Sequence, residues 1–351
     1  MMLLHRRRRR QRSVRVAPPP YTYSATAWSL DDWDDTNALQ KTRFTKHQLR
    51  VLVKALKIEA TEWSHRIKPD ATMALVVTLM RLSRPRHLAD LCDTFGYSGS
   101  YLSRVINDVC QHLIEQHHER LQWHPRLRQY KHLRALARRV AATKPRCGGR
   151  IWGFIDGHFT PFSRPESDQH MFYSGHKKLH GMVFQAITTP DGLISSLFGP
   201  FVGRTNDWGM YNASRVPRRL HRMMPADGPR PMLYLYGDPA YYLSHGVMSP
   251  FGPRKQISSR KRRFNKTLSR HRISVEHSFG QIFNLFKSLS FQKGLRVGDQ
   301  AVAAFFLVAA LLCNCWTCLN EGNQTSMKYQ LAPPTLEEYL GLGVNDLAGI
   351  M

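Results

Sequence analysis

Three acidic side chains in the second half of the chain occupy positions where acids are unusual. Asp156 follows the apolar run IWGFI, Asp238 follows MLYLYG, and each precedes a turn-type residue, glycine or proline. Glu276 lies in RISVEHSFGQIFNLF, where helical spacing places it on one face with Phe279 and Phe283. A carboxylate beside an apolar core is costly unless it is paired or binds a cation. These three positions therefore need a chemical reason.

Cutting or joining a phosphodiester bond would supply that reason. Two divalent ions about 4 Å apart activate the attacking oxygen and stabilise the leaving oxygen, and a few carboxylates hold them. Hard oxygen ligands suit Mg²⁺ or Mn²⁺. The acids thus predict a site for two such ions, although each acid alone could also be a cap or an ion-pair partner of an arginine.

The charge balance of the chain favours a polyanionic partner. The 351 residues include 51 Lys and Arg but only 25 Asp and Glu, a net charge of +26. Residues 1–20 contain seven arginines, and +19 remains without them. Binding to phosphates releases condensed counterions, so we expect double-stranded DNA rather than an acidic membrane surface as the partner.

Changes in composition divide the chain into the parts that position these acids. Residues 1–37 are basic and contain three consecutive prolines, which predicts a disordered tail. Helical patterns fill residues 38–145, and strand patterns begin after Pro145 and the glycine pair that follows it. We assign 150–322 to a catalytic domain and 323–351 to a C-terminal tail. The fold class is α/β, a mixed sheet flanked by helices and preceded by a helical domain.

Apolar runs in the catalytic part predict the elements that carry the acids. Three strands are expected at 151–159, 180–189 and 193–201, with a turn between the last two. A fourth strand leads to Asp238. A loop over 249–269 then precedes a helix that begins near Ser269, followed by a long apolar helix.

The helical part contains the pattern helix, glycine turn, helix. The first helix starts after His87 and stops at Gly96, and the next begins with Ser98 or Ser100 as its N-cap. This pattern is typical both of helix-turn-helix DNA readers and of simple helical packing, and both interpretations stay open. On the second helix we expect Leu102, Val105, Ile106 and Val109 to face the core and Tyr101, Ser103, Arg104 and Asn107 to point outward.

Two apolar features near the C-terminal end each allow an alternative interpretation. Residues 301–319 are long enough to cross a bilayer, but Asn314 and the acidic flanks favour a buried core helix and no membrane association. Cys313, Cys315 and Cys318 have no matching ligand pair nearby, which favours core thiols over a metal site. The cysteines show no disulfide framework, which indicates a reducing compartment.

A set of motifs between residues 150 and 315 occurs in a defined order. They are FIDGH, RP at 164–165, YSGHKKLHGMVFQAI, PDGLI, GPFVGRTND, GDPAY and RISVEHSFG. In this order they resemble the motifs of Harbinger-type (PIF/Harbinger) transposases, which belong to the DDE superfamily of endonucleases with a catalytic Asp-Asp-Glu triad. The resemblance implies an RNase H-like fold, with the first Asp on strand one, the second after strand four and the Glu on a following helix.

The resemblance also implies roles for individual acids. It makes Asp156, Asp238 and Glu276 the catalytic residues and the ligands of Mg²⁺ or Mn²⁺. Asp207 matches the acid of an additional His-Asp pair in the family, so we expect it to be a further metal ligand. Asn206 stands where the family has the histidine. Tyr173 and His180 match a family motif too, and their role is open between approach to strand two and contact with DNA.

Similar transposases are commonly nuclear, and they rely on a separate Myb-like DNA-binding protein. The joining of two transposon ends implies a homodimer. The arginine run at residues 6–10 is typical of a nuclear localisation signal, or alternatively of a solvated tail without an address. We therefore expect a nuclear protein with a Myb-like partner.

A second basic cluster lies just ahead of Glu276. Residues 254–272 hold nine Lys or Arg in 19 positions. We expect this segment to lie along DNA in the site, although RKRR could instead be a second nuclear signal and the segment a plain solvated loop. The candidates for DNA contact along the whole chain are Arg104, Lys177, Lys178, Arg260, Lys261, Arg262 and Arg263.

The function predicted from these residues is a metal-dependent DNA endonuclease or transposase that cuts and transfers strands. The alternative is a domesticated, catalytically inactive, nuclear DNA-binding protein derived from such an enzyme. Both agree with the charge of the chain. A nicking assay on variants of the acids separates them.

Overall fold

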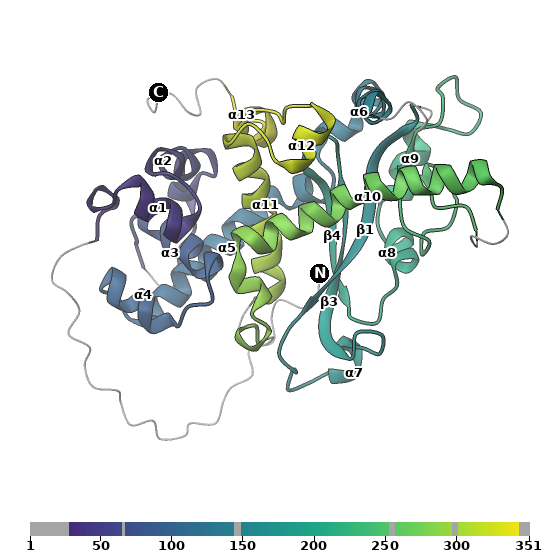
Figure 1. Ribbon diagram of the computed structural model, residues 1–351. Helices are drawn as coiled ribbons and strands as arrows, with labels where there is room; N and C mark the ends of the chain where they lie inside the picture. The colour runs from purple at the N-terminus through teal and green to yellow at the C-terminus, as the bar shows by residue number, and fades with distance from the viewer. Residues whose placement is uncertain (1–27, 65–66, 144–148, 253–256, 297–300, 344–351) are drawn as a thin grey trace.

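A helical part and a sheet-containing part lie side by side in the protein (Figure 1). The computed structural model describes residues 28–64, 67–143, 149–252, 257–296 and 301–343. The arginine run expected to be a nuclear signal lies outside these residues.

Short helices build the N-terminal part. They are η1 (Leu30–Asp32), α1 (Asp35–Thr42), α2 (Lys46–Ala55), η2 (Ile58–Ala60), α3 (Ala71–Ser83), α4 (Leu88–Phe95) and α5 (Gly99–Gln122). The tail boundary expected at residue 37 is therefore wrong, because helical structure already begins at Leu30. The reason is local: Leu30 and Trp33 are buried in the core, and the Asp34 carboxylate caps α1 by accepting from the Asn37 amide.

Helices α4 and α5 meet at the predicted glycine turn. Gly96 has a left-handed backbone with φ 71°, and Ser98 caps α5 by accepting from the Tyr101 amide. The four expected core side chains of α5 are buried, and Arg104 and Asn107 are exposed. Helix α5 is longer than a recognition helix needs, and it also contacts β4 and α11 of the sheet-containing part. Its use as a DNA reader stays a prediction.

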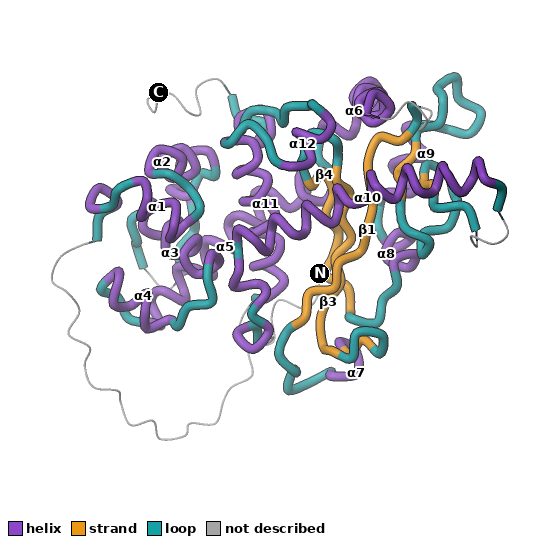
Figure 2. The backbone as a smooth tube through the Cα atoms, viewed as in Figure 1, coloured by secondary structure: helices purple, strands orange, loops and turns teal. Residues whose placement is uncertain are grey.

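One mixed sheet forms the centre of the second part (Figure 2). Its strands are β1 (Ile151–Pro161), β2 (Tyr173–Ser174), β3 (Leu179–Thr188), β4 (Ile194–Val202), β5 (Tyr234–Tyr236) and β6 (Val247–Met248). The order is β2-β3-β1-β5-β6, with β4 also paired to β3. Strands β1, β3 and β4 are antiparallel, whereas β5 runs parallel to β1 and β6 parallel to β5. This mixed α/β arrangement is consistent with an RNase H-like fold.

The first acid lies inside β1 rather than at its end, which corrects the expectation from the sequence. β1 continues to Pro161 because β3 stays paired with it as far as Gly181. The parallel partner β5 is shorter, and its last pair with β1 joins Phe154 and Tyr236. Asp156 and Asp238 each come two residues after that pair, so both lie where the parallel pairing stops.

Helices cover both faces of the sheet. On one face, Trp152 and Ile155 of β1 lie in a buried cluster with residues of α6 (Tyr130–Thr143) and α9 (Val216–Met223). On the other, Phe154 lies in a cluster with α5 and two further helices. Those helices are α10 (Ser259–Leu285) and α11 (Val302–Leu319), and the remaining elements are η4 (Pro125–Arg128), α7 (Gln169–Phe172), α8 (Asp207–Ala213), η7 (Lys287–Ser290) and η8 (Gln292–Gly294).

Helix α10 begins ten residues earlier than the sequence predicts. The expected loop before Ser269 is already helical from Ser259, with Ser258 as N-cap accepting from the Lys261 amide. Lysine and arginine are good helix formers, and their charge hides the helix when only apolar spacing is read. The first half of α10 extends beyond the edge of the sheet (Figure 1).

Helix α11 is a core helix of this fold. By length and composition it could cross a membrane, yet most of it is buried inside the protein, against α5, α10, β4 and a C-terminal helix. The amide of Asn314 accepts from the Ile194 backbone N–H and donates to the Ile194 carbonyl and to the Tyr339 hydroxyl, each at 2.9 Å. The three cysteines of the helix are buried and free, as the core-thiol interpretation predicts.

The segment expected to be a C-terminal tail is folded over most of its described length. It forms α12 (Gln324–Tyr329) and α13 (Leu336–Leu340). Tyr329, Leu336 and Tyr339 are buried, and α12 contacts α6 and α10 while α13 contacts α11 and α2. The prediction of a tail after residue 322 is wrong because these scattered apolar side chains complete the core.

Candidate active site

Four acids approach one region beside the centre of the sheet, each from a different element. Asp156 comes from β1, Asp238 from the turn after β5, Asp207 from the first position of α8 and Glu276 from the middle of α10. A side chain at Gly157 would collide with Oδ1 of Asp207. The glycine after Asp156 therefore lets the Asp207 carboxylate lie against β1.

Burial and nearby aspartates raise the pKa of two of these acids, Asp156 and Asp207. Burial raises the pKa of Asp156 to about 7, with Arg272 opposing the rise and Asp238 and Asp207 adding to it. Burial also raises the pKa of Asp207 to about 6, again with a contribution from Asp238. Like charges that share a poorly solvated site disfavour each other's ionised form. The charge of Asp238 therefore reaches both Asp156 and Asp207.

Arg272 connects the fourth acid to the others. Its Nη1 donates to Oδ2 of Asp156 at 2.8 Å, and its Nη2 lies 2.7 Å from Oε1 of Glu276. Arg272 and Glu276 are one turn apart on α10, and this i,i+4 spacing is the signal that could have revealed the pair in the sequence. The sequence prediction did not include this arginine.

Tyr241 and Gln185 form a buried layer next to the aspartates. The Tyr241 hydroxyl accepts from Nε2 of Gln185 at 3.1 Å, and the same Nε2 lies 3.3 Å from the Asp207 carbonyl. Burial holds the pKa of Tyr241 well above its ordinary value, and the charges of Asp207 and Asp156 raise it further. The phenol is therefore neutral, and the Gln185 side chain ties the start of α8 to β3. Tyr241 lies in the GDPAY motif, but a tyrosine at this position did not by itself indicate a functional residue.

His158 fixes α10 on the sheet. It follows Asp156 by two residues, so both side chains lie on the same face of β1. Its ring stacks on Phe279 at 4.6 Å and packs against Phe283 at 4.9 Å. Burial lowers the pKa of His158 to about 4, with a smaller contribution from Lys177. The neutral ring thus holds the helix that carries Glu276.

The acids fit a divalent metal in donor type but not in their present arrangement. All are carboxylates, the hard oxygen ligands that Mg²⁺ and Mn²⁺ prefer, and two of them are buried enough for their pKa to be raised. Over the residues that the structure describes, however, no group of three or more His, Cys, Asp or Glu is close enough to hold a metal ion. The Arg272 guanidinium lies between Asp156 and Glu276 instead.

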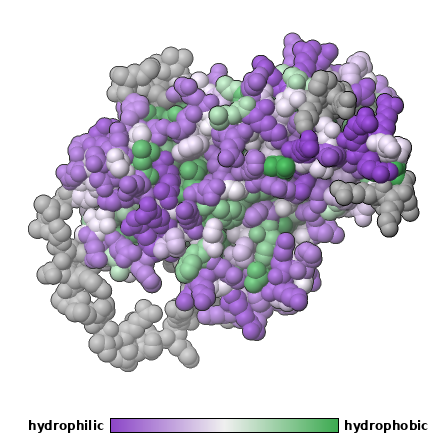
Figure 3. All heavy atoms as spheres, viewed as in Figure 1, coloured by the Kyte–Doolittle hydropathy of each residue, from purple (hydrophilic) through white to green (hydrophobic). Residues whose placement is uncertain are grey.

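The predicted DNA-contact residues lie on the surface. Arg104 is exposed on α5, and Lys177 and Lys178 are exposed in the turn between β2 and β3. The four basic residues at 260–263 are exposed on the projecting half of α10, where Figure 3 shows strongly hydrophilic side chains. Within the described ranges, none of these seven takes part in an ion pair.

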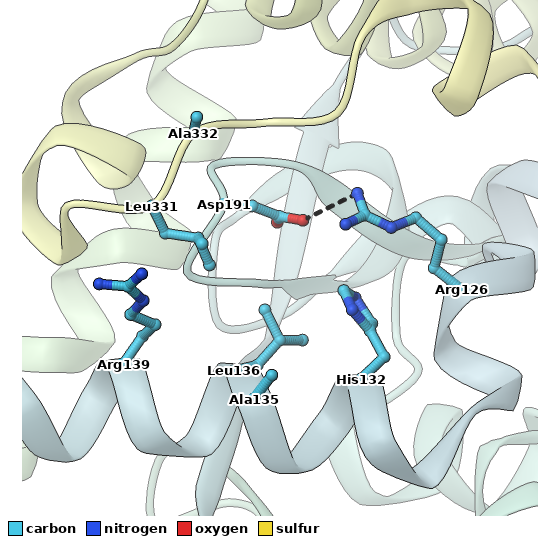
Figure 4. A pocket seen from close by; sticks show the side chains of 8 residues that line it. All are labelled: Arg126, His132, Ala135, Leu136, Arg139, Asp191, Leu331 and Ala332. Carbon is cyan, nitrogen blue, oxygen red and sulfur yellow. Dashed lines mark ion pairs between the residues drawn. The ribbon is translucent and has the colours of Figure 1, made fainter.

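Another buried acid belongs to a separate pocket, shown in Figure 4. Asp191, in the turn between β3 and β4, lies 3.6 Å from Nη1 of Arg126 and accepts from the Thr189 hydroxyl. The pocket has a volume of about 230 Å³ and is also lined by His132 and Leu331. Its carboxylate is already paired, so we assign it a structural role.

The fold is thus a mixed α/β sheet with acids from several elements beside its centre. A family model described as DDE superfamily endonuclease matches residues 155–314, a segment that includes all four acids. The match supports a DDE transposase-like nuclease family for this part of the chain. No curated protein and no solved structure matches the chain.

Proposed function

We propose that the protein is a metal-dependent DNA endonuclease or transposase of the Harbinger type that cuts and transfers DNA strands. One observation carries the proposal: Asp156 on β1 and Asp207 on α8 both have a raised pKa, chiefly because they are buried and further because the charge of Asp238 lies near them, within the segment that matches the DDE endonuclease model. A structural role does not require acids from three elements to share a poorly solvated region.

The proposed ligands of the metal are Asp156, Asp238 and Glu276, with Asp207 as a further ligand. Bound Mg²⁺ or Mn²⁺ ions, two in number, would neutralise the acids and supply the activated oxygen and leaving-group stabilisation of phosphodiester chemistry. The residues of this chain contribute the positioning. Gly157 lets Asp207 lie against β1, and His158 holds α10 on the sheet.

The projecting half of α10 is the proposed DNA-contact surface. The chain has no Asp or Glu between Asp238 and Glu276. The basic side chains of this surface therefore have no acidic neighbour within the same stretch of sequence. Because α10 also carries Glu276, DNA held by its first half would lie along the same helix, starting about 20 Å from that acid. Binding of the phosphates would release counterions and depend on salt.

A second candidate function is favoured by the same arginine that links the acids. Arg272 pairs with Asp156 and Glu276 as a structural ion-pair partner would. This observation favours a domesticated DNA-binding protein without catalysis. A nuclear location, a homodimer and a Myb-like partner protein accompany both functions as proposals that come from the resemblance to Harbinger-type transposases.

A nicking assay separates the two functions. Supercoiled plasmid is incubated with the purified protein and Mg²⁺ or Mn²⁺, and open-circular product is measured for the wild type and for Asp156→Ala and Asp238→Ala. The control is Asp227→Ala, which changes an exposed aspartate in a loop away from the cluster. Nicking by the wild type and the control, lost in both cluster variants, supports the enzyme. Nicking that survives both changes rejects this assignment of the acids, and its absence from the wild type favours the DNA-binding protein.

A further inference from the structure

A single guanidinium is shared by two acids that lie far apart in the chain. Nη1 of Arg272 donates to Oδ2 of Asp156 at 2.8 Å, and Nη2 of Arg272 forms an ion pair with Oε1 of Glu276 at 2.7 Å. The exposed fractions of these side chains are 15% for Asp156, 27% for Arg272 and 50% for Glu276. The bridge is thus partly buried on the side of β1 and open to solvent on the side of α10, so Arg272 can leave it without unfolding of the helix.

The bridge uses the oxygen atoms that a metal ion would need. A magnesium ion binds its oxygen ligands at about 2.1 Å. Oδ2 of Asp156 and Oε1 of Glu276 both face the guanidinium, and an ion shared by these two acids would have to lie between the same oxygens. The arginine and the shared ion are therefore alternative occupants of one position.

Asp156 and Glu276 each form one described ion pair, and in both the cation is Arg272. Among the described ion pairs, Arg272 is therefore the one cation that joins Asp156 on β1 to Glu276 on α10. A bound metal ion would take over this link between the two acids.

We propose that Arg272 is a positioning residue that holds Asp156 and Glu276 together in the metal-free protein and exchanges with the divalent cation when it binds. This inference rests on the proposed function, because it takes these acids as metal ligands. After the exchange, the guanidinium lies on the same helix as the basic residues 260–263, where a DNA phosphate is an available partner.

The test measures metal binding without DNA and without catalysis. Mn²⁺ is titrated by calorimetry into the wild type, Arg272→Gln and Arg272→Lys. Removing the competing cation should make Arg272→Gln bind Mn²⁺ at least about 10-fold tighter, because the ion no longer has to displace a charged hydrogen-bonded group. Arg272→Lys should lie between the two, because one ammonium does not reproduce the two-armed bridge.

The matched control is Arg270→Gln, which removes an exposed arginine two residues away on the same helix. It should leave Mn²⁺ affinity unchanged, which excludes a general effect of lowering the positive charge. Far-UV circular dichroism checks that each variant is folded. If folded Arg272→Gln binds Mn²⁺ as weakly as the wild type, or more weakly, the exchange is rejected, because a merely structural arginine gives that result.

A second measurement needs no change at the acids. The Nε–H resonance of Arg272 in the wild type, assigned by its loss in Arg272→Lys, should shift when Mg²⁺ saturates the protein. An unshifted resonance at saturation rejects the exchange even if Arg272→Gln does not fold. Nicking of plasmid by the wild type is measured separately. If Arg272 exchanges with the metal ion but the protein does not nick DNA, only the proposed function is rejected. If the protein nicks DNA but Arg272 does not exchange, only the role of Arg272 is rejected.

Discussion

The raised pKa of Asp156 predicts that this carboxylate destabilises the metal-free protein at neutral pH. In the unfolded chain the carboxyl ionises near its ordinary pKa of 3.8, whereas in the folded protein it keeps its proton up to about pH 7. Between these values the folded state binds more protons than the unfolded state, so the free energy of unfolding falls as pH rises. The stabilisation is complete below pH 3.8 and is lost by the time the pH has passed 7.

The size of the effect follows from the same numbers. Each pKa unit corresponds to 1.36 kcal/mol, so Asp156 alone lowers the free energy of unfolding by about 2 kcal/mol between pH 5 and pH 7, and by about 3 kcal/mol between pH 5 and pH 8. Its side chain is 15% exposed, so solvent screening reduces this only modestly. Asp207, with a pKa of about 6, adds about 1 kcal/mol in the same direction.

The change that tests this is Asp156→Asn, which removes the titration and keeps the shape. Urea unfolding is measured at pH 5 and at pH 8 in the presence of EDTA, for the wild type and the variant. The wild type should lose about 3 kcal/mol more than Asp156→Asn over this interval. Comparing the two pH dependences removes any constant effect of the substitution, such as the weaker bond from Arg272.

The control is Asp227→Asn, at an exposed loop position, which should keep the pH dependence of the wild type. The reasoning is refuted if wild type and Asp156→Asn lose the same free energy between pH 5 and pH 8. That result would mean that Asp156 is already ionised in the folded protein at pH 5, neutralised by Arg272.

Three further changes test other parts of the structure. Replacing the basic residues of α10 should lower DNA affinity and flatten its salt dependence in anisotropy titrations, whereas an unchanged slope would place DNA elsewhere. Gly157→Ala should push the Asp207 carboxylate off β1, abolish plasmid nicking and cost about 1–3 kcal/mol in urea unfolding; full activity would show that Asp207 is dispensable there. Asn314→Leu should cost about 3 kcal/mol, because the Ile194 backbone and the Tyr339 hydroxyl lose their partner, and unchanged stability would contradict that. The basic residues to be replaced by alanine are Arg260, Lys261, Arg262 and Arg263.

Much of the sheet could be predicted from the sequence because its strands are apolar runs punctuated by turn residues. The turn between β3 and β4 and the core-facing residues of α5 follow directly from such patterns. The end of β1 does not, because it depends on how far β3 stays paired. The start of α10 was also missed, since a helix made of lysine and arginine has no apolar stripe until it reaches the core.

The acids could be recognised from their neighbours along the chain, but their partners could not. Asp156 and Asp238 stand out because each follows an apolar run. Arg272 resembles every other arginine in a basic segment until the fold brings β1 against α10. Tyr241 and Gln185 are likewise separated by 56 positions, and only the fold joins them. Local spacing therefore identifies the acids, and the groups that control their charge depend on tertiary contacts.

Helix α5 links the two parts of the protein as one continuous rod of 24 residues, about 36 Å long. Its first turn lies beside α4, and it also packs on β4 and α11. The separation between the α4–α5 turn and the acids is therefore built into the fold rather than set by a flexible linker. If DNA bound both at the α4–α5 turn and at the acids, every duplex would be cut at the same number of base pairs from the sequence bound at the turn.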